Sequence, residues 1–301
     1  MRNKFSETIY KLSRRNKKIF VVASDISPSG KMAQFQSQKN NFINVGVSEQ
    51  VMIGVCSGLA LSGMKPFAYT IAPFSIFRPF EMVRDDLCYQ KLPVTVVGMG
   101  AGTVYANLGG THTAIEDISI ARSLPNMQVL SPCDPLELES CVNYCANKSK
   151  NPSYLRIGKT GEKNYTNKST EKWEFGKIRK IKNGNNICIL SHGPIISMAF
   201  EVVQKTKINL SIYSCHTLKP FDENKMKTIF KKYKKIITLE DHSEIGGLSE
   251  LVKLSAYQNK YKGEIKTFSL KDDFLHIFNS QKDLLNAHGI SVSKIIKQII
   301  N

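Results

Sequence analysis

Short apolar runs alternate along the chain with stretches whose apolar residues recur at helical spacing. Continuous apolar runs predict strands buried on both faces, and the helical spacing predicts amphipathic helices. The predicted strands cover residues 19–24, 42–46, 66–71, 94–99, 127–130, 153–157, 187–191, 209–214 and 235–240. The predicted helices cover residues 3–16, 49–62, 77–89, 115–123, 135–146, 195–205, 223–232, 246–256 and 292–300. Because strands and helices alternate, we predict an α/β protein with mainly parallel sheets.

One polar stretch interrupts this alternation of predicted strands and helices. From Gly161 to Thr170 the chain loses its apolar residues almost completely, which is typical of a linker. We therefore predict a first α/β domain over 1–162, a linker over 163–174 and a second α/β domain over 175–301. Each predicted domain is long enough to bury its own hydrophobic core.

The formal net charge of +17 raises the question of a nucleic-acid binder. The densest basic clusters lie at 177–182 and 231–235, match no nucleic-acid-binding motif and show no run of interleaved aromatic residues. We favour the alternative of basic, solvated faces spread over the whole protein. Such a surface would still attract phosphorylated or nucleotide-linked substrates.

The seven cysteines are an odd number and lie mostly in apolar runs, as reduced buried thiols do. Cys141 and Cys145 are one helical turn apart, but no further His or Cys nearby completes a zinc site, so we predict no metal site in this chain. The sequence has no apolar run of membrane-spanning length and no signal-like start. A cytoplasmic protein is the expectation.

A glycine-rich segment, Gly98-Met-Gly100-Ala-Gly102, follows the predicted strand 94–99. A dinucleotide-binding fingerprint needs its third glycine one residue later and a helix that opens there. Both features are missing, so we do not expect a dinucleotide site.

The segment Asn44-Val-Gly-Val-Ser-Glu49-Gln50 joins a short strand to a helix rich in small residues. Glu49 would lie in the first helical turn, where the helix dipole stabilises a carboxylate. A carboxylate buried there could also share a proton with a ligand nitrogen. The segment alone does not decide between these two roles.

This segment resembles the Gly-Ile-x-Glu-Gln/His signature of transketolases and deoxyxylulose-phosphate synthases, and further matches follow in the same order. They include an aromatic and arginine-rich segment, a Thr-His-x-x-x-Glu-Asp stretch and two segments of the C-terminal domain. The matching residues are Pro66–Thr70, Phe74–Arg84, Gly110–Asp117, Arg122–Asn126, Ser131–Pro135, His216–Pro220 and Glu240–Gly247. The resemblance covers almost the whole chain and implies a pyrimidine-binding domain followed by a transketolase C-terminal domain.

The resemblance implies that thiamine diphosphate is the cofactor. Glu49 would then hydrogen-bond the ring nitrogen of the aminopyrimidine and so promote loss of the thiazolium proton. Phe74, with Phe77 as the competing candidate, would stack on the pyrimidine, and Gln50 and Asp25 would be further cofactor contacts.

The resemblance also implies substrate contacts. His112 would hydrogen-bond the reacting oxygen of the substrate as charge develops. The candidates for the substrate phosphate and the donor are Arg2, Ser29, Arg78, Lys159 and Arg156.

Two positions depart from the family pattern. Leu108 stands where an acidic residue usually contacts a sugar hydroxyl, and Lys159 replaces an arginine, which removes bidentate phosphate binding. A modified or nucleotide-linked sugar, or a simpler 2-keto acid, therefore becomes an alternative to the ordinary pentose phosphates.

The Gly-Asp-Gly motif and the asparagine pair that hold the family's divalent cation and diphosphate do not occur in this sequence. The resemblance therefore implies a partner chain that carries this motif and the Mg²⁺, in an α₂β₂ heterotetramer. The predicted function is transfer of a two-carbon ketol unit between sugars. The alternatives are a β-type subunit of a 2-oxo acid dehydrogenase or pyruvate-using acyl transferase, and a non-catalytic scaffold or regulatory subunit.

Overall fold

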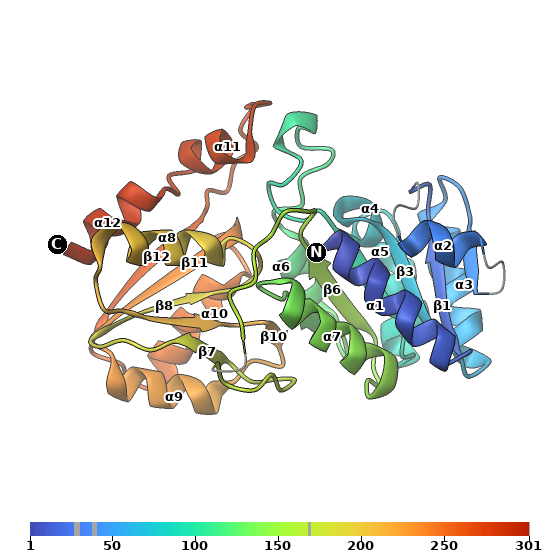
Figure 1. Ribbon diagram of the computed structural model, residues 1–301, viewed down its shortest axis with the longest axis horizontal. Helices are drawn as coiled ribbons and strands as arrows, with labels where there is room; N and C mark the ends of the chain where they lie inside the picture. Colours follow the sequence, from blue (N-terminus) through green and yellow to red (C-terminus); the bar gives the residue numbers. More distant parts are fainter. Residues whose placement is uncertain (27–30, 38–40, 168–169, 301) are drawn as a thin grey trace.

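The computed structural model describes residues 1–26, 31–37, 41–167 and 170–300. Two sheets lie side by side, each with helices on both faces (Figure 1). The predicted α/β class with mainly parallel sheets is confirmed. The N-terminus lies near the line where the two halves of the molecule meet, and the C-terminus lies at the far end of the second half (Figure 1).

The first sheet has seven strands in the order β10-β5-β6-β4-β3-β1-β2. Its strands are β1 (Ile19–Ala23), β2 (Phe42–Asn44), β3 (Lys65–Ile71), β4 (Thr95–Met99), β5 (Gln128–Leu130), β6 (Ser153–Ile157) and β10 (Thr217–Lys219). All neighbours pair in parallel except β10, which comes from the second half and pairs antiparallel with β5. The first sheet therefore contains a strand from the predicted second domain.

Helices cover both faces of the first sheet. One face carries α1 (Arg2–Arg15), α2 (Lys31–Ser37) and α7 (Pro135–Asn147). The other carries α3 (Glu49–Leu61), α4 (Ala72–Ile76), α5 (Phe80–Met82), the π-helical segment η1 (Val83–Tyr89) and α6 (Asp117–Ser123). The single helix predicted over 77–89 is instead broken before α5, where Pro79 stands. Proline has no N–H to donate, which disfavours it inside a helix.

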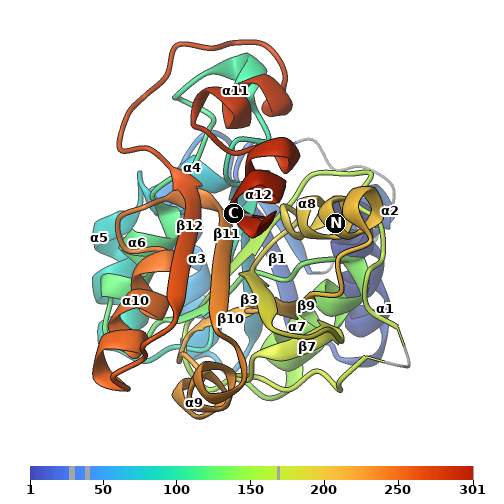
Figure 2. The ribbon, with the colours of Figure 1, turned by 90° about the vertical axis from the view of Figure 1, so that its left-hand side faces the viewer.

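The second sheet has five strands in the order β12-β11-β8-β9-β7 (Figure 2). Its strands are β7 (Arg179–Lys182), β8 (Ile187–Ser191), β9 (Ser211–Ser214), β11 (Lys235–Ser243) and β12 (Glu264–Leu270). Its helices are α8 (Ile196–Thr206) and α12 (Val292–Ile300) on one face, α9 (Glu223–Lys232) and α10 (Leu248–Gln258) on the other, and α11 (Gln281–Ala287) beside the first half. The pattern did not predict β7, β10, β12, α2 or α11. The edge strands β7 and β12 carry lysines and half-exposed residues, so they lack the continuous apolar run of a central strand.

The predicted linker is tied to the first half. The carboxylate of Asp134 accepts hydrogen bonds from the backbone N–H groups of Tyr165 (2.8 Å) and Thr166 (2.6 Å). Further along, the ring of Phe175 stacks on Tyr144 with ring centroids 4.2 Å apart. The polar stretch is therefore packed against the protein, and the exact domain boundaries stay predictions.

All seven cysteines are buried thiols without a disulfide. Burial raises the pKa of Cys145 to about 12, so this thiol stays protonated at neutral pH.

In the described ranges no group of three or more His, Cys, Asp or Glu is placed to hold a metal ion. None of the described helices is long and apolar enough to cross a membrane. The cytoplasmic location stays a prediction.

Two buried histidines of the second half have structural contacts. The ring nitrogen Nε2 of His242 accepts the backbone N–H groups of Ile118 (3.2 Å) and Ser119 (3.3 Å) and so caps α6 of the first half. Burial lowers the pKa of His242, and the neutral ring can accept these bonds. His216 stacks on Trp173 with ring centroids 5.1 Å apart.

Glu240 of β11 is a fully buried carboxylate that caps α10. It accepts the backbone N–H groups of Leu248 (2.6 Å) and Ser249 (2.9 Å) and the hydroxyl of Ser269 (2.8 Å). Burial alone would raise the pKa of Glu240, but the nearby ring of His192, whose Nε2 lies 3.5 Å from Oε2, and the bond from Ser249 outweigh it and lower the pKa to about 2. Folding therefore stabilises the ionised form of this carboxyl.

We predict that Glu240→Gln lowers the free energy of unfolding by about 3 kcal/mol at neutral pH. This figure is the free-energy equivalent of the difference between the pKa of Glu240 in the folded protein and its ordinary pKa. Because the folded pKa is depressed, this stabilisation is complete above the ordinary pKa of 4.5 and is lost as pH falls toward 2. Denaturant unfolding at a series of pH values measures it. Glu201→Gln, at an exposed surface pair with Lys205, is the control. An equal loss in both variants would contradict the prediction.

Candidate active site

The turn before α3 fixes the position of Glu49. The hydroxyl of Ser24, just after β1, donates to the carbonyl of Gly46 (2.7 Å) and accepts the N–H of Ser48 (3.2 Å). Gly46 has φ +71°, which glycine adopts without strain. Glu49 follows as the first residue of α3 and is 4% exposed. The carboxylate is thus buried in the first helical turn, as the sequence predicted.

One side chain neutralises this carboxylate. The guanidinium Nη1 of Arg78 donates to Glu49 Oε1 at 3.0 Å, and the Arg78 side chain is 47% exposed. The same guanidinium lies over the ring of Phe74, 4.2 Å from its centroid. Arg78 therefore connects the buried acid to a half-buried aromatic ring.

Phe74 in turn contacts His112. The two ring centroids are 5.2 Å apart and the planes meet at 76°, an edge-to-face arrangement. The Nδ1 atom of His112 is 2.9 Å from the hydroxyl of Thr111. Acid, arginine, aromatic ring and imidazole thus form one continuous row of side chains.

The row continues toward the start of the chain. The ring of Tyr105 lies 6.4 Å from that of His112, and the amino group of Lys159 lies 4.6 Å from the Tyr105 centroid. The backbone N–H of Arg2 donates to the carbonyl of Lys159 at 2.8 Å. The Nε of Arg2 is among the buried polar atoms without a hydrogen-bond partner in the described part of the chain.

Sheet topology explains why these residues meet. Glu49, Phe74, His112 and Lys159 follow the carboxyl ends of β2, β3, β4 and β6. These strands are parallel members of one sheet, so their carboxyl ends share one edge. This edge is where open α/β sheets bind their ligands.

The other candidate cofactor contacts differ in how exposed their side chains are. Phe77 packs against the core beside Ala72 and Ala101, which favours Phe74 as the accessible ring. Gln50 is exposed on α3, and Asp25 is exposed with φ +44°. Ser29 lies outside the described residues.

The structure does not support Arg156 as a substrate contact. This arginine is 3% exposed, and its Nε donates to the carboxylate of Asp117 at 2.8 Å. Its Nη2 donates to the backbone carbonyls of Asp241 (2.7 Å) and Ala114 (3.3 Å). Because these bonds engage the guanidinium inside the protein, it is not available to a substrate phosphate. Lys159, which is half-buried beside Tyr105, remains the basic candidate from this segment.

Tyr105 joins the row although the sequence did not single it out. It lies in an irregular loop, where neither hydrophobic periodicity nor spacing marks a residue that faces a site. Only the path of the loop brings its ring beside His112.

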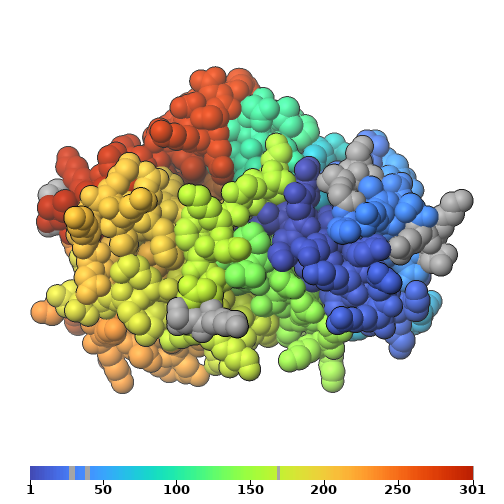
Figure 3. Space-filling view, viewed as in Figure 1, coloured from blue at the N-terminus to red at the C-terminus, as the bar shows by residue number. Residues whose placement is uncertain are grey.

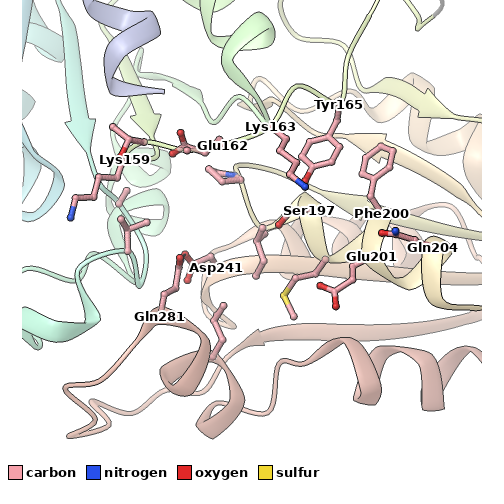
Figure 4. A pocket seen from close by; sticks show the side chains of 18 of the residues that line it. Lys159, Glu162, Lys163, Tyr165, Ser197, Phe200, Glu201, Gln204, Asp241 and Gln281 are labelled. Atoms are coloured by element: carbon pink, nitrogen blue, oxygen red, sulfur yellow. The ribbon is translucent and has the colours of Figure 1, made fainter. Parts of the chain in front are cut away.

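A cavity of about 920 Å³ lies elsewhere in the described part of the chain. It lies between the two halves and is lined by Glu162, Lys163, Glu201, Asp241 and Gln281, among others (Figure 4). Of the candidate residues only Lys159 lines it, and its amino group points away from the other labelled side chains (Figure 4). This cavity therefore meets the row that begins at Glu49 only at Lys159.

Comparison with known families decides the identity of the chain. Residues 1–162 match the model of the transketolase pyrimidine-binding domain, and residues 176–295 match that of the transketolase C-terminal domain. The chain belongs to the transketolase family.

Two relatives are themselves short chains of this family. The chain is 32% identical to a putative transketolase C-terminal section of Methanocaldococcus jannaschii, over 100% of this chain and 95% of that protein. It is 28% identical to a subunit of the apulose-4-phosphate transketolase of Phocaeicola vulgatus, over 83% of this chain and 81% of that protein. It also matches 1-deoxy-D-xylulose-5-phosphate synthase of Clostridium perfringens at 30% identity, but spans only 48% of that longer protein.

A solved structure has nearly the same shape. It is described as a split gene transketolase, an inactive β4 tetramer, and superposes with a TM-score of 0.88 at 29% identity, over 98% of this chain and 95% of that one. The predicted family is therefore confirmed, and this member corresponds to the C-terminal section of split transketolases.

We predict that Arg78→Met destabilises the protein by roughly 1–3 kcal/mol, because the buried carboxylate of Glu49 loses its cation. Thermal unfolding measures the change. Arg84→Met removes an arginine from the exposed pair with Asp85, which is worth at most about 1 kcal/mol, and serves as the control. Equal stability of the Arg78 variant and the control would mean that solvent, not Arg78, compensates Glu49.

Proposed function

We propose that this chain is the part of a split transketolase that binds and activates the pyrimidine half of thiamine diphosphate. Members of the family use this cofactor. The single observation that carries the proposal is the buried Glu49 carboxylate, aligned with Phe74 and His112 on the ligand-binding edge of the sheet.

The residues present fit the pyrimidine ring. When bound, thiamine diphosphate supplies a carbanion equivalent that attacks the carbonyl of a sugar substrate. Glu49 would hold a proton at the pyrimidine nitrogen, and Phe74 would offer its ring for stacking. For this, Arg78 would leave the Glu49 carboxylate and the Phe74 ring, and its 47% exposed side chain has room to move.

His112 would act on the substrate. Its imidazole is half-exposed beside Phe74, where it would hydrogen-bond the oxygen on which charge develops during ketol transfer. Lys159 and Arg2 would hold an anionic group of the substrate, and the unpartnered Nε of Arg2 supports that role within the described residues.

The acceptor sugar would pass Leu108, which lies shortly before His112 in the sequence. The Leu108 side chain is 47% exposed. A leucine side chain cannot hydrogen-bond a sugar hydroxyl, so we propose an acceptor other than an ordinary aldose phosphate. Similarity to part of an apulose-4-phosphate transketolase supports a modified sugar. The transketolase relatives likewise favour ketol transfer over the 2-oxo acid dehydrogenase and scaffold alternatives.

A partner chain would supply the diphosphate site and the Mg²⁺. The surface we assign to it is the outer face of α3 with the turn before it, because this surface is apolar and exposed next to Glu49. Val47, Val51 and Leu61 are 69%, 52% and 66% exposed. An added Cβ at Gly54 or Gly58 would meet nothing within 4 Å, which leaves room for close approach of another backbone. The relative described as an inactive β4 tetramer supports a requirement for a different partner chain.

We predict that Glu49→Ala lowers kcat at least about 10²-fold, because the proton-sharing group is lost. Turnover of a ketose phosphate donor by the complex with a Gly-Asp-Gly-containing partner measures this. The secondary structure and partner affinity should not change. Glu139→Ala removes a half-exposed acid from α7 and is the matched control. Near-normal turnover in the Glu49 variant would refute the assignment.

We predict that Val51→Glu weakens partner binding at least about tenfold, equivalent to about 1.4 kcal/mol, because a charge would be buried in an apolar contact. Calorimetric titration with the partner measures it. Leu254→Glu on α10 places the same charge at an apolar residue of similar exposure, 53%, in the second half. If this control weakens binding as much as Val51→Glu, the partner does not dock specifically on α3.

A further inference from the structure

His112 is carried by a loop that leaves the first sheet after β4. Residues 100–114, here called the His112 loop, close at their base through the paired backbone bonds Gly102 N to Ala114 O (2.9 Å) and Ala114 N to Gly102 O (3.0 Å). The loop contains the short 3₁₀ segment η2 (Ala106–Leu108). It projects from the first half alongside α11 of the second half (Figures 1 and 2).

The second half holds the base of this loop. The carboxylate of Asp241, at the end of β11, accepts the N–H of Thr103 (3.1 Å) and its hydroxyl (2.8 Å). The amide of Gln281, at the start of α11, donates to the Thr103 hydroxyl and to Asp241 Oδ2, both at 3.2 Å. A Cβ on Gly102 would lie 2.2 Å from Asp241 Oδ2, so only glycine permits this approach.

The second half also packs on the tip of the loop. A Cβ on Gly109 would lie 2.6 Å from Cε1 of Phe278, so the aromatic ring lies directly on this glycine. The carbonyl of Gly109 accepts the N–H of His112 (3.0 Å) and of Thr113 (3.2 Å). The residue under the Phe278 ring thus forms the turn that carries His112. In the space-filling view the orange-red atoms of the second half lie against the blue-green atoms of this loop (Figure 3).

We infer that the second domain positions His112, with Asp241 and Gln281 fixing the base of its loop and Phe278 fixing its tip. This inference rests on the proposed function, because it gives the C-terminal domain a part in catalysis through a residue of the first domain. Phe278 is a positioning residue and touches neither substrate nor cofactor. It sets where the imidazole lies relative to Phe74.

The competing explanation is that these contacts only hold the two domains together. Phe278 distinguishes this explanation from a role in positioning His112. Its side chain is 57% exposed, so it contributes little buried area to the contact between the halves. A residue that only joins the domains would change stability when removed. A positioning residue changes the behaviour of the His112 loop while the fold remains intact.

Hydrogen exchange of the full chain without partner or cofactor tests the contact directly. Phe278→Ala is expected to speed exchange of the backbone amides of residues 109–113 about fivefold or more, since their turn loses its cover. Gln281→Ala is expected to do the same at residues 102–106. Exchange in α3 and the thermal midpoint stay as in the unmodified chain. Tyr257→Ala, at a ring that is 84% exposed on α10, is the control. Unchanged exchange at 109–113 in Phe278→Ala would overturn the inference.

Kinetics of the complex with the partner test its consequence. Phe278→Ala is expected to lower kcat about ten- to a hundred-fold, as small displacements of a reacting group do, with the KM for thiamine diphosphate unchanged. Phe278→Tyr restores most of kcat, and Tyr257→Ala leaves it unchanged. Equal losses in kcat and cofactor affinity would overturn the inference. If the unmodified complex transfers no ketol unit, the proposed function fails, while the exchange experiment still reports on the loop.

Discussion

A buried guanidinium connects the two halves of this protein. Arg156 bridges the carboxylate of Asp117 at the start of α6 and the backbone carbonyl of Asp241 at the end of β11. The hydroxyl of Tyr154 donates to the same Asp117 at 2.7 Å. A charge buried to this degree persists only when it is paired and hydrogen-bonded, so this contact fixes both chain segments. The side chain of Asp241, placed in this way, reaches the His112 loop.

The row of candidate site residues and the contact between the two halves therefore form one structure. Glu49, Phe74 and His112 come from loops at one edge of the first sheet, but the His112 loop is also held from the second half. Strand β10 adds to this continuity by joining the first sheet from the second half. The two halves have separate sheets, yet neither half alone contains everything that shapes the row.

In the proposed function a partner chain would complete the site. The Glu49 carboxylate is buried but pairs with a half-exposed arginine, and the apolar face of α3 beside it is exposed. Burying that face against another chain would exclude water from the acid and strengthen its interactions. The proposed division of the cofactor site between two chains would use this geometry.

The sequence by itself determined the α/β class, most of the central strands and helices, and the position of Glu49 at a helix start. These features depend on local periodicity and on apolar runs of sufficient length, which each segment carries in its own residues. The family resemblance pointed to Phe74 and His112, which the structure places side by side. Edge strands such as β12 were not predicted, because their half-exposed residues form no continuous apolar run.

Only the tertiary structure decided the roles of Arg156, Tyr105 and the glycines after β4. The local sequence around an arginine near the end of a strand does not show whether the side chain faces a substrate or a buried carboxylate. In the structure, Arg156 pairs with Asp117, which lies 39 positions away in the chain. The glycines of 98–102 resemble a nucleotide motif, but Gly102 makes room for the side chain of Asp241 from the other half. Contacts between residues distant in sequence leave no periodic signal, so they become visible only when the chain is folded.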